Sequence, residues 1–97
     1  MLSRTYDILC AGELLIDLIS EGFEDSLQEA DTFRRLPGGS PANLCGNMAR
    51  LGNKALLAAS IGKDALGDFL GEYVEGLGVD TRLIFQVDTP TSLVLVT

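Results

Sequence analysis

The apolar residues of this chain fall into short uninterrupted runs and into longer segments with helical spacing. Two runs, residues 7–12 and 54–61, have little polar alternation and predict strands of a parallel sheet that is covered on both faces. A third run, residues 14–19, is interrupted by one carboxylate, Asp17, and also predicts a strand. Asp17 is therefore expected where this strand passes from the core to a site.

Two segments repeat apolar residues at the helical period. The first is expected to begin with Ser40 as its N-cap and Pro41 at its first helical position, and to end at Gly52. Its apolar face is expected to comprise Leu44, Cys45, Met48, Ala49 and Leu51. The second helix is expected to be capped by Asp64 and to end at Gly78. Its apolar stripe is Leu66, Phe69, Leu70, Tyr73, Val74 and Leu77.

Three further segments, residues 33–36, 82–87 and 91–97, predict strands, and the polar, acidic residues 20–32 predict a surface loop. The order strand, helix, strand, helix, strand predicts an α/β architecture with parallel strands. We expect residues 33–36 and the two strands after residue 82 to form a smaller, separate sheet.

Composition excludes several classes of function. With 14 acidic and 7 basic residues the net charge is −7, which argues against a nucleic-acid surface and against docking on an anionic membrane. The absence of histidine excludes Ser-His-Asp and Cys-His chemistry within these residues. Cys10 and Cys45 lie in apolar runs without a CxxC motif, which predicts free, buried thiols and a cytoplasmic protein.

Four residues are candidates for ligand binding, each with a purely structural alternative. Gly38 and Gly39 allow a ligand to approach the main chain, but they also suit a tight turn between a strand and a helix. The Asn43 amide offers donors and an acceptor to a polyol, or it serves as an auxiliary helix cap. Asp17 would be costly to bury unpaired, so its partners are either sugar hydroxyls or a local turn.

Spaced motifs along the chain resemble those of the ribokinase-like (PfkB) carbohydrate kinases. They are Gly38-Gly39-Ser40-Pro41-Ala42-Asn43, Ala49-Arg50-Leu51-Gly52, Ile61-Gly62-Lys63-Asp64 with Gly67, and Gly78-Val79-Asp80-Thr81, preceded by Gly12-Glu13 and Ile16-Asp17. The resemblance extends from Asp7 to Thr97. Ser40-Pro41 is similar to the fructokinase-type branch, and Leu15 departs from the sugar-binding asparagine of the ribokinases.

The resemblance implies that residues 1–97 are the N-terminal part of a Rossmann-like α/β/α ribokinase-type fold with a small β-sheet lid. The lid strands are expected near residues 14–19, 33–36 and 82–97, and the α/β core in the rest. The implied activity of the full-length protein is ATP-dependent, fructokinase-like phosphorylation of a sugar hydroxyl. The implied sugar-binding residues are Asp17, Gly38, Gly39 and Asn43.

The family's second signature, a G-A-G-D segment with the catalytic aspartate, does not occur in this sequence. Because the chain also stops inside a strand pattern, we expect it to be the N-terminal piece of a longer protein. ATP and Mg²⁺ are expected to serve the full-length enzyme through residues beyond 97, and the isolated chain is expected to be inactive. The alternatives are a 2-keto-3-deoxygluconate kinase and a non-catalytic sugar-binding module or a lid that forms a homodimer.

Overall fold

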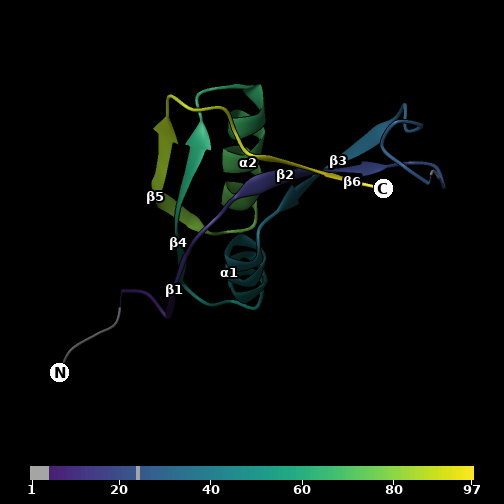
Figure 1. The fold of residues 1–97 in the computed structure, drawn as a ribbon. Helices are drawn as coiled ribbons and strands as arrows, with labels where there is room; N and C mark the ends of the chain where they lie inside the picture. Colours follow the sequence, from purple (N-terminus) through teal and green to yellow (C-terminus); the bar gives the residue numbers. More distant parts are fainter. Residues whose placement is uncertain (1–4, 24) are drawn as a thin grey trace.

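The computed structural model describes residues 5–23 and 25–97, and Glu24 of the predicted acidic loop lies outside them. Six strands and two helices follow one another along the described chain (Figure 1). Their bounds are β1 (Ile8–Ala11), β2 (Leu15–Ser20), β3 (Phe33–Gly38), α1 (Ser40–Arg50), β4 (Ala55–Gly62), α2 (Ala65–Gly76), β5 (Asp80–Val87) and β6 (Leu93–Val96). The predicted α/β class is confirmed.

The core sheet has the strand order β1-β4-β5, and both of its strand pairs are parallel. Parallel neighbours need a crossover connection, which α2 supplies between β4 and β5. The prediction that residues 82–87 belong to the smaller sheet is therefore wrong. β5 begins right after the turn at Gly78 and pairs in parallel with β4 as far as Gly62.

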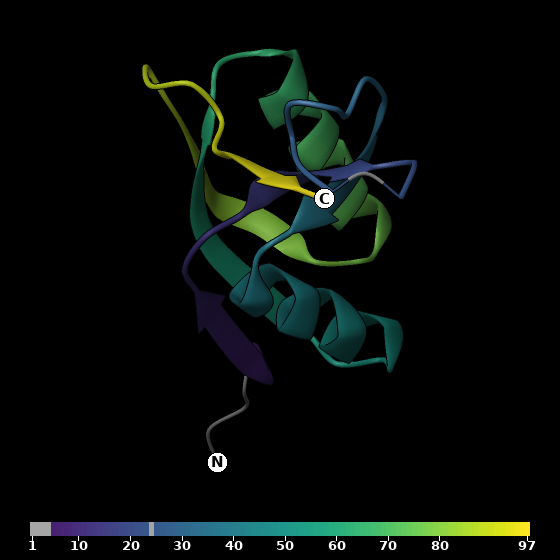
Figure 2. The same cartoon turned by 45° about the vertical axis from the view of Figure 1, so that its right-hand side comes forward.

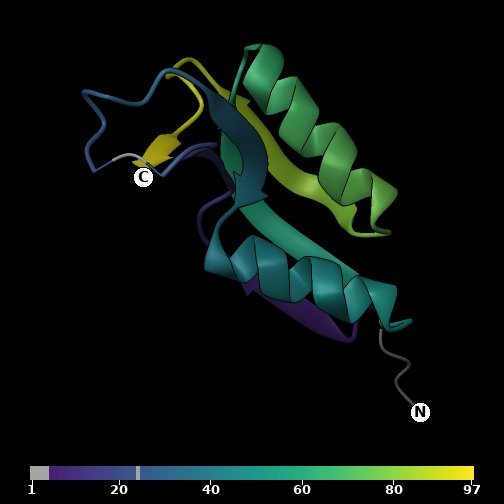
Figure 3. The same ribbon diagram turned by 90° about the vertical axis from the view of Figure 1, so that its right-hand side faces the viewer.

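Both helices cover the same face of the core sheet, as the view from the helix side shows (Figure 3). Leu57 of β4 and Leu70 of α2 meet in this layer, and both are completely buried. On the opposite face Leu9 of β1 is 60% exposed. Within the described residues α1 and α2 cover one face of the core sheet, and on the other face the central strand β4 still buries Leu56, which is 8% exposed.

Helix α1 approaches the core sheet through small residues. Ala42 and Cys45 are buried, and a Cβ at buried Gly46 would lie 2.8 Å from Cδ1 of Leu77, which directly follows α2. Leu44 and Leu51 are 51% and 78% exposed. The predicted apolar face is therefore confirmed for Cys45 and Ala49 and wrong for Leu44 and Leu51, because close packing against the sheet favours the small residues of this helix over its leucines.

A second, small sheet consists of β2, β3 and β6 in the order β3-β2-β6. Strand β2 pairs with β3 in antiparallel and with β6 in parallel orientation. The small sheet projects sideways from the core in Figure 1, with the loop of residues 21–32 at its far end. Figure 2 shows the chain passing between core and small sheet after β1, before α1 and after β5.

Candidate functional site

The candidate site lies where β3 ends and α1 begins. Gly39 is the N-cap residue of α1, with φ of +108°, and its carbonyl accepts a hydrogen bond of 2.9 Å from the Asn43 N–H. The expectation that Ser40 caps the helix is wrong, because Ser40 is already helical and its side chain makes no capping bond. A non-glycine residue rarely adopts the Gly39 conformation, which explains the glycine at this position.

The carboxyl end of β1 touches the same junction. A Cβ at Gly12 would lie 2.5 Å from Pro41 Cγ, and a Cβ at Gly39 would overlap the main-chain oxygen of Glu13. Three segments of backbone thus meet closely where the chain leaves the parallel sheet. In open α/β sheets, ligands bind outside the carboxyl ends of the strands, which is the end occupied by this junction.

Asp17 lies directly beside Gly38. In the small sheet Asp17 pairs with Leu36 and Leu15 pairs with Gly38. A Cβ at Gly38 would overlap the Asp17 carboxylate and would lie 2.8 Å from Asp17 Cγ. The glycine therefore leaves room for the carboxylate, and the structure brings together two of the residues that the sequence singled out.

The two faces of the small sheet differ. One face, here called the Asp17 face, carries the side chains of Leu15, Asp17, Ile19, Arg34, Leu36, Val94 and Val96 according to the strand register. The opposite face packs on the core: Ile16 is fully buried there, and the Arg35 guanidinium lies 3.9 Å from the centre of the Phe69 ring of α2. Asp17 therefore points away from the core layer beneath the small sheet.

Asn43 is exposed, one turn into α1. It lines a narrow cleft of about 40 Å³ together with Gly38, Pro37, Asn47 and, from α2, Tyr73. Gly38 thus neighbours both Asp17 and Asn43.

Asp64 connects α2 to the segment that leads into β6. As predicted it caps α2, since its Oδ1 accepts a 2.7 Å bond from the Gly67 N–H. The Thr91 hydroxyl donates to Asp64 Oδ1 at 2.6 Å and accepts from the Gly62 N–H at 2.9 Å, and the Thr91 N–H donates to Asp64 Oδ2 at 2.9 Å. The bond from the Thr91 hydroxyl is the main cause that lowers the pKa of Asp64 below its usual 3.8. These bonds fix the start of β6 against the core.

We expect the Asp64→Asn variant to unfold at a lower temperature than wild type at pH 7. A lowered pKa in the folded state stabilises the protein above the unfolded-state pKa, and this stabilisation is lost as pH falls through the folded-state pKa. The difference in midpoint should therefore shrink below about pH 4. The matched control is Asp88→Asn, which removes an exposed carboxylate lying 3.1 Å from Lys63 Nζ and should change little. An equal effect of both variants at pH 7 would contradict this role of Asp64.

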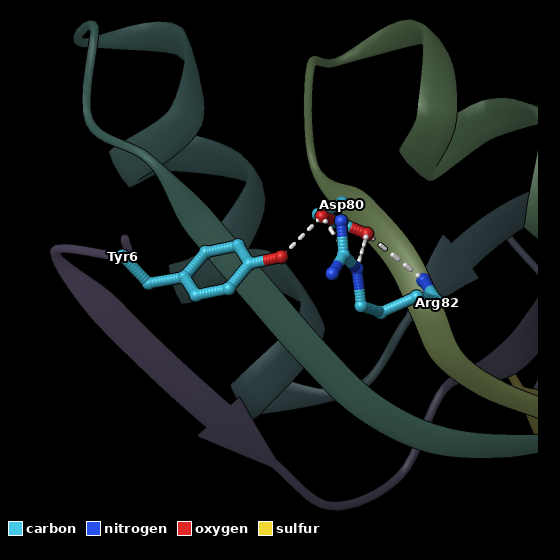
Figure 4. Close-up of polar contacts among 3 residues, drawn as sticks. All are labelled: Tyr6, Asp80 and Arg82. Atoms are coloured by element: carbon cyan, nitrogen blue, oxygen red, sulfur yellow. Dashed lines mark hydrogen bonds and ion pairs between the residues drawn. The ribbon is translucent and has the colours of Figure 1, made fainter. Parts of the chain in front are cut away.

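A second polar cluster lies at the other end of the core sheet, where its strands begin (Figure 4). The Tyr6 hydroxyl donates to Asp80 Oδ2 at 2.5 Å, and the Arg82 N–H and Nε donate to Asp80 Oδ1 at 3.0 and 3.2 Å. The bond from Tyr6 is the largest cause that lowers the pKa of Asp80. The cluster joins the segment before β1 to the start of β5, and we assign it a structural role.

Other chemistry is not supported by the described residues. Cys10 and Cys45 are free and buried as predicted, and burial raises the pKa of the Cys45 thiol to about 12, which makes it a poor nucleophile. No group of three acidic, cysteine or histidine side chains suited to a metal occurs among residues 5–23 and 25–97. No helix in the same ranges is long and apolar enough to cross a membrane.

Two features were not predicted from the sequence. They are the bonds between Asp64 and Thr91 and the positions of Arg34 and Arg35 on opposite faces of the small sheet. Alternation along a strand predicts that adjacent arginines face opposite ways. Only the register of the sheet shows which of them shares a face with Asp17.

Residues 5–97 match the pfkB family of carbohydrate kinases, and the chain belongs to this family. It is 40% identical over 94 residues to the ATP-dependent 6-phosphofructokinase of Thermoanaerobacterium thermosaccharolyticum, which covers 97% of this chain and 29% of that protein. It is 37% identical over 82 residues to a 5-dehydro-2-deoxygluconokinase of Clostridium beijerinckii, covering 84% of this chain and 24% of that protein.

Among solved structures, the fructokinase of Halothermothrix orenii is similar, with a TM-score of 0.88 and 37% identity over 92% of this chain and 32% of that one. The predicted ribokinase-type fold and the predicted family are confirmed. The chain spans less than a third of the length of each of these three proteins.

Proposed function

We propose that this chain is the sugar-binding, N-terminal part of a longer kinase that transfers the γ-phosphate of ATP to a sugar hydroxyl. The observation that carries the proposal is the Asp17 carboxylate held against Gly38 on the face of the small sheet that does not pack on the core. A carboxylate accepts hydrogen bonds from sugar hydroxyls, and a glycine beside it lets a sugar approach the main chain.

In this proposal each residue binds or positions the sugar. Asp17 accepts hydrogen bonds from hydroxyls, Gly38 and Gly39 present main-chain groups, and the Asn43 amide binds a further hydroxyl. Binding and orientation of the acceptor are a large part of phosphoryl-transfer catalysis, because the reaction needs mainly positioning and charge stabilisation.

The small sheet would act as a lid over the sugar. Among the described residues it is joined to the core by buried Ile16, by the Thr91 bonds to Asp64 and by the stacking of Arg35 on Phe69. A lid that closes over the acceptor excludes water, so that the phosphate passes to the sugar rather than to solvent. The Asp64 contact would fix the point at which β6 leaves the core.

ATP and Mg²⁺ belong to the full-length enzyme in this proposal. We assign the metal and the catalytic base to residues outside this segment. Bound Mg²⁺ and ATP would supply the phosphoryl group and neutralise its charge.

The test is a screen of ATP-dependent phosphorylation by the full-length protein over hexoses, hexose phosphates and 2-keto-3-deoxygluconate. We expect turnover of at least one sugar by the full-length protein and none by the isolated 97-residue chain. Sugar phosphorylation by the isolated chain would contradict the division of roles, and no phosphorylation by the full-length protein would contradict the kinase.

One observation favours a second candidate, a non-catalytic module that binds sugar or pairs with another copy through the small sheet. All four residues of β6, Leu93 to Val96, are exposed, and β6 is the last strand in the order β3-β2-β6. An exposed apolar edge strand is a template for a further strand. Sugar binding without turnover by the full-length protein in the same screen would favour this module.

A further inference from the structure

Arg34 shares the Asp17 face of the small sheet. It pairs with Ile19, while Asp17 pairs with Leu36, so Arg34 is the diagonal neighbour of Asp17 on the adjacent strand. Such diagonal positions are about 7–8 Å apart. Asp17 and Arg34 thus lie on the same surface of the small sheet, and the apolar side chains of Ile19 and Leu36 lie next to both of them.

The charge of Arg34 is not neutralised within the described residues. Its side chain is exposed, and none of the ion pairs between described residues includes it. Arg34 lines a hollow of about 340 Å³ with Ile19, Ser20, Glu21 and Leu36. A volume of this size is enough for one end of a small polar ligand.

Arg35, the next residue, is used differently. Its guanidinium lies over the Phe69 ring on the opposite face, where it joins the small sheet to α2. Stacking of this kind is a structural use of arginine. In a chain with a net charge of −7, Arg34 is also the only cation among the residues that make up the Asp17 face.

We propose that Arg34 binds an acidic group, a phosphate or a carboxylate, at the end of the acceptor sugar remote from the hydroxyls held by Asp17. This inference rests on the proposed role of Asp17 in sugar binding. The planar guanidinium donates paired hydrogen bonds that fit both acidic groups. An acidic sugar gains these bonds and a neutral hexose does not, so the site would favour acidic sugars.

Glu21 allows a second test of the role of Arg34, because Glu21 lines the same hollow. An acidic ligand on Arg34 would be repelled by Glu21. Replacement of Glu21 by glutamine should therefore strengthen binding of acidic sugars and leave neutral sugars unchanged.

The experiment measures kcat/KM of the full-length protein for D-fructose, D-fructose 6-phosphate and 2-keto-3-deoxygluconate. We expect wild type to prefer one of the acidic sugars, and Arg34→Leu to lower kcat/KM for that sugar about 10- to 100-fold while fructose changes less than about twofold. The matched control is Arg35→Leu, which removes the same charge one residue away and should affect neutral and acidic sugars alike. A loss confined to the phosphate or to the keto-acid identifies which acidic group Arg34 binds.

Calorimetric titration of the same three sugars without ATP separates this inference from the proposed function. If no sugar is phosphorylated but Arg34→Leu still weakens binding of an acidic sugar selectively, the kinase proposal fails and the Arg34 site stands. Equal effects of Arg34→Leu on neutral and acidic sugars, selectivity lost equally in Arg35→Leu, or a wild-type preference for fructose would each overturn the assignment of Arg34.

Discussion

The Asp17→Ala variant of the full-length protein should have a kcat/KM for its acceptor sugar about 100-fold below wild type. The carboxylate lies against Gly38 on a face of the small sheet that does not pack on the core. If Asp17 binds the sugar as we propose, its removal deletes hydrogen bonds to the sugar rather than to the fold. Asp17→Asn keeps one acceptor oxygen, so its kcat/KM should lie between those of wild type and Asp17→Ala. The measurement is steady-state kinetics at saturating ATP.

Two controls separate sugar binding from a loss of folding. Asp31→Ala removes an exposed carboxylate from the loop of residues 21–32 and should leave kcat/KM unchanged. The thermal unfolding midpoint of Asp17→Ala should stay close to that of wild type in the absence of sugar. A kcat/KM within twofold of wild type, or the same loss in both alanine variants, would remove Asp17 from the site.

Replacement of Gly39 by alanine should be the most damaging single change at the junction of β3 and α1. The residue has φ of +108°, and an added Cβ would overlap the Glu13 carbonyl oxygen and lie 3.0 Å from its carbon. Backbone strain alone costs about 1–3 kcal/mol, and the overlap with main-chain atoms adds to it. We expect a lower unfolding midpoint together with weaker sugar binding, since Glu13 and the start of α1 would be forced apart.

Gly52→Ala is the matched control, because Gly52 also has a positive φ, +95°, but nothing lies within 4 Å of its added Cβ. This variant carries the strain without the overlap, so it should destabilise less and leave sugar affinity unchanged. Gly39→Ala and Gly52→Ala with equal unfolding midpoints and equal sugar affinities would show that close packing at Glu13 has no part in the site.

Much of the fold could be predicted from local signals. Asp64 caps α2 and glycines with positive φ follow both helices, as their positions indicated, because caps depend on a few neighbouring residues. Leu44 and Leu51 of α1 were predicted to be buried but are exposed, because helical spacing does not show which side of a helix packs closest to the sheet. Assignment of β5 to the core sheet needed the pairing with β4, which is a contact between distant residues.

The candidate site was predictable in its members but not in its arrangement. Gly38 and Asp17 stood out by residue type, and their contact follows from a register that no local pattern fixes. Thr91 carries no local signal, because its partner Asp64 is 27 residues away along the chain. Long-range contacts of this kind therefore mark the limit of what residue type and spacing predict.

The most direct test of the account is a crystal structure of the full-length protein with its preferred acceptor sugar. We expect sugar hydroxyl oxygens within about 2.6–3.0 Å of the Asp17 carboxylate and within hydrogen-bonding distance of the Asn43 amide, with the sugar against Gly38 and Gly39. A sugar bound elsewhere, with the Asp17 carboxylate left facing solvent, would contradict it.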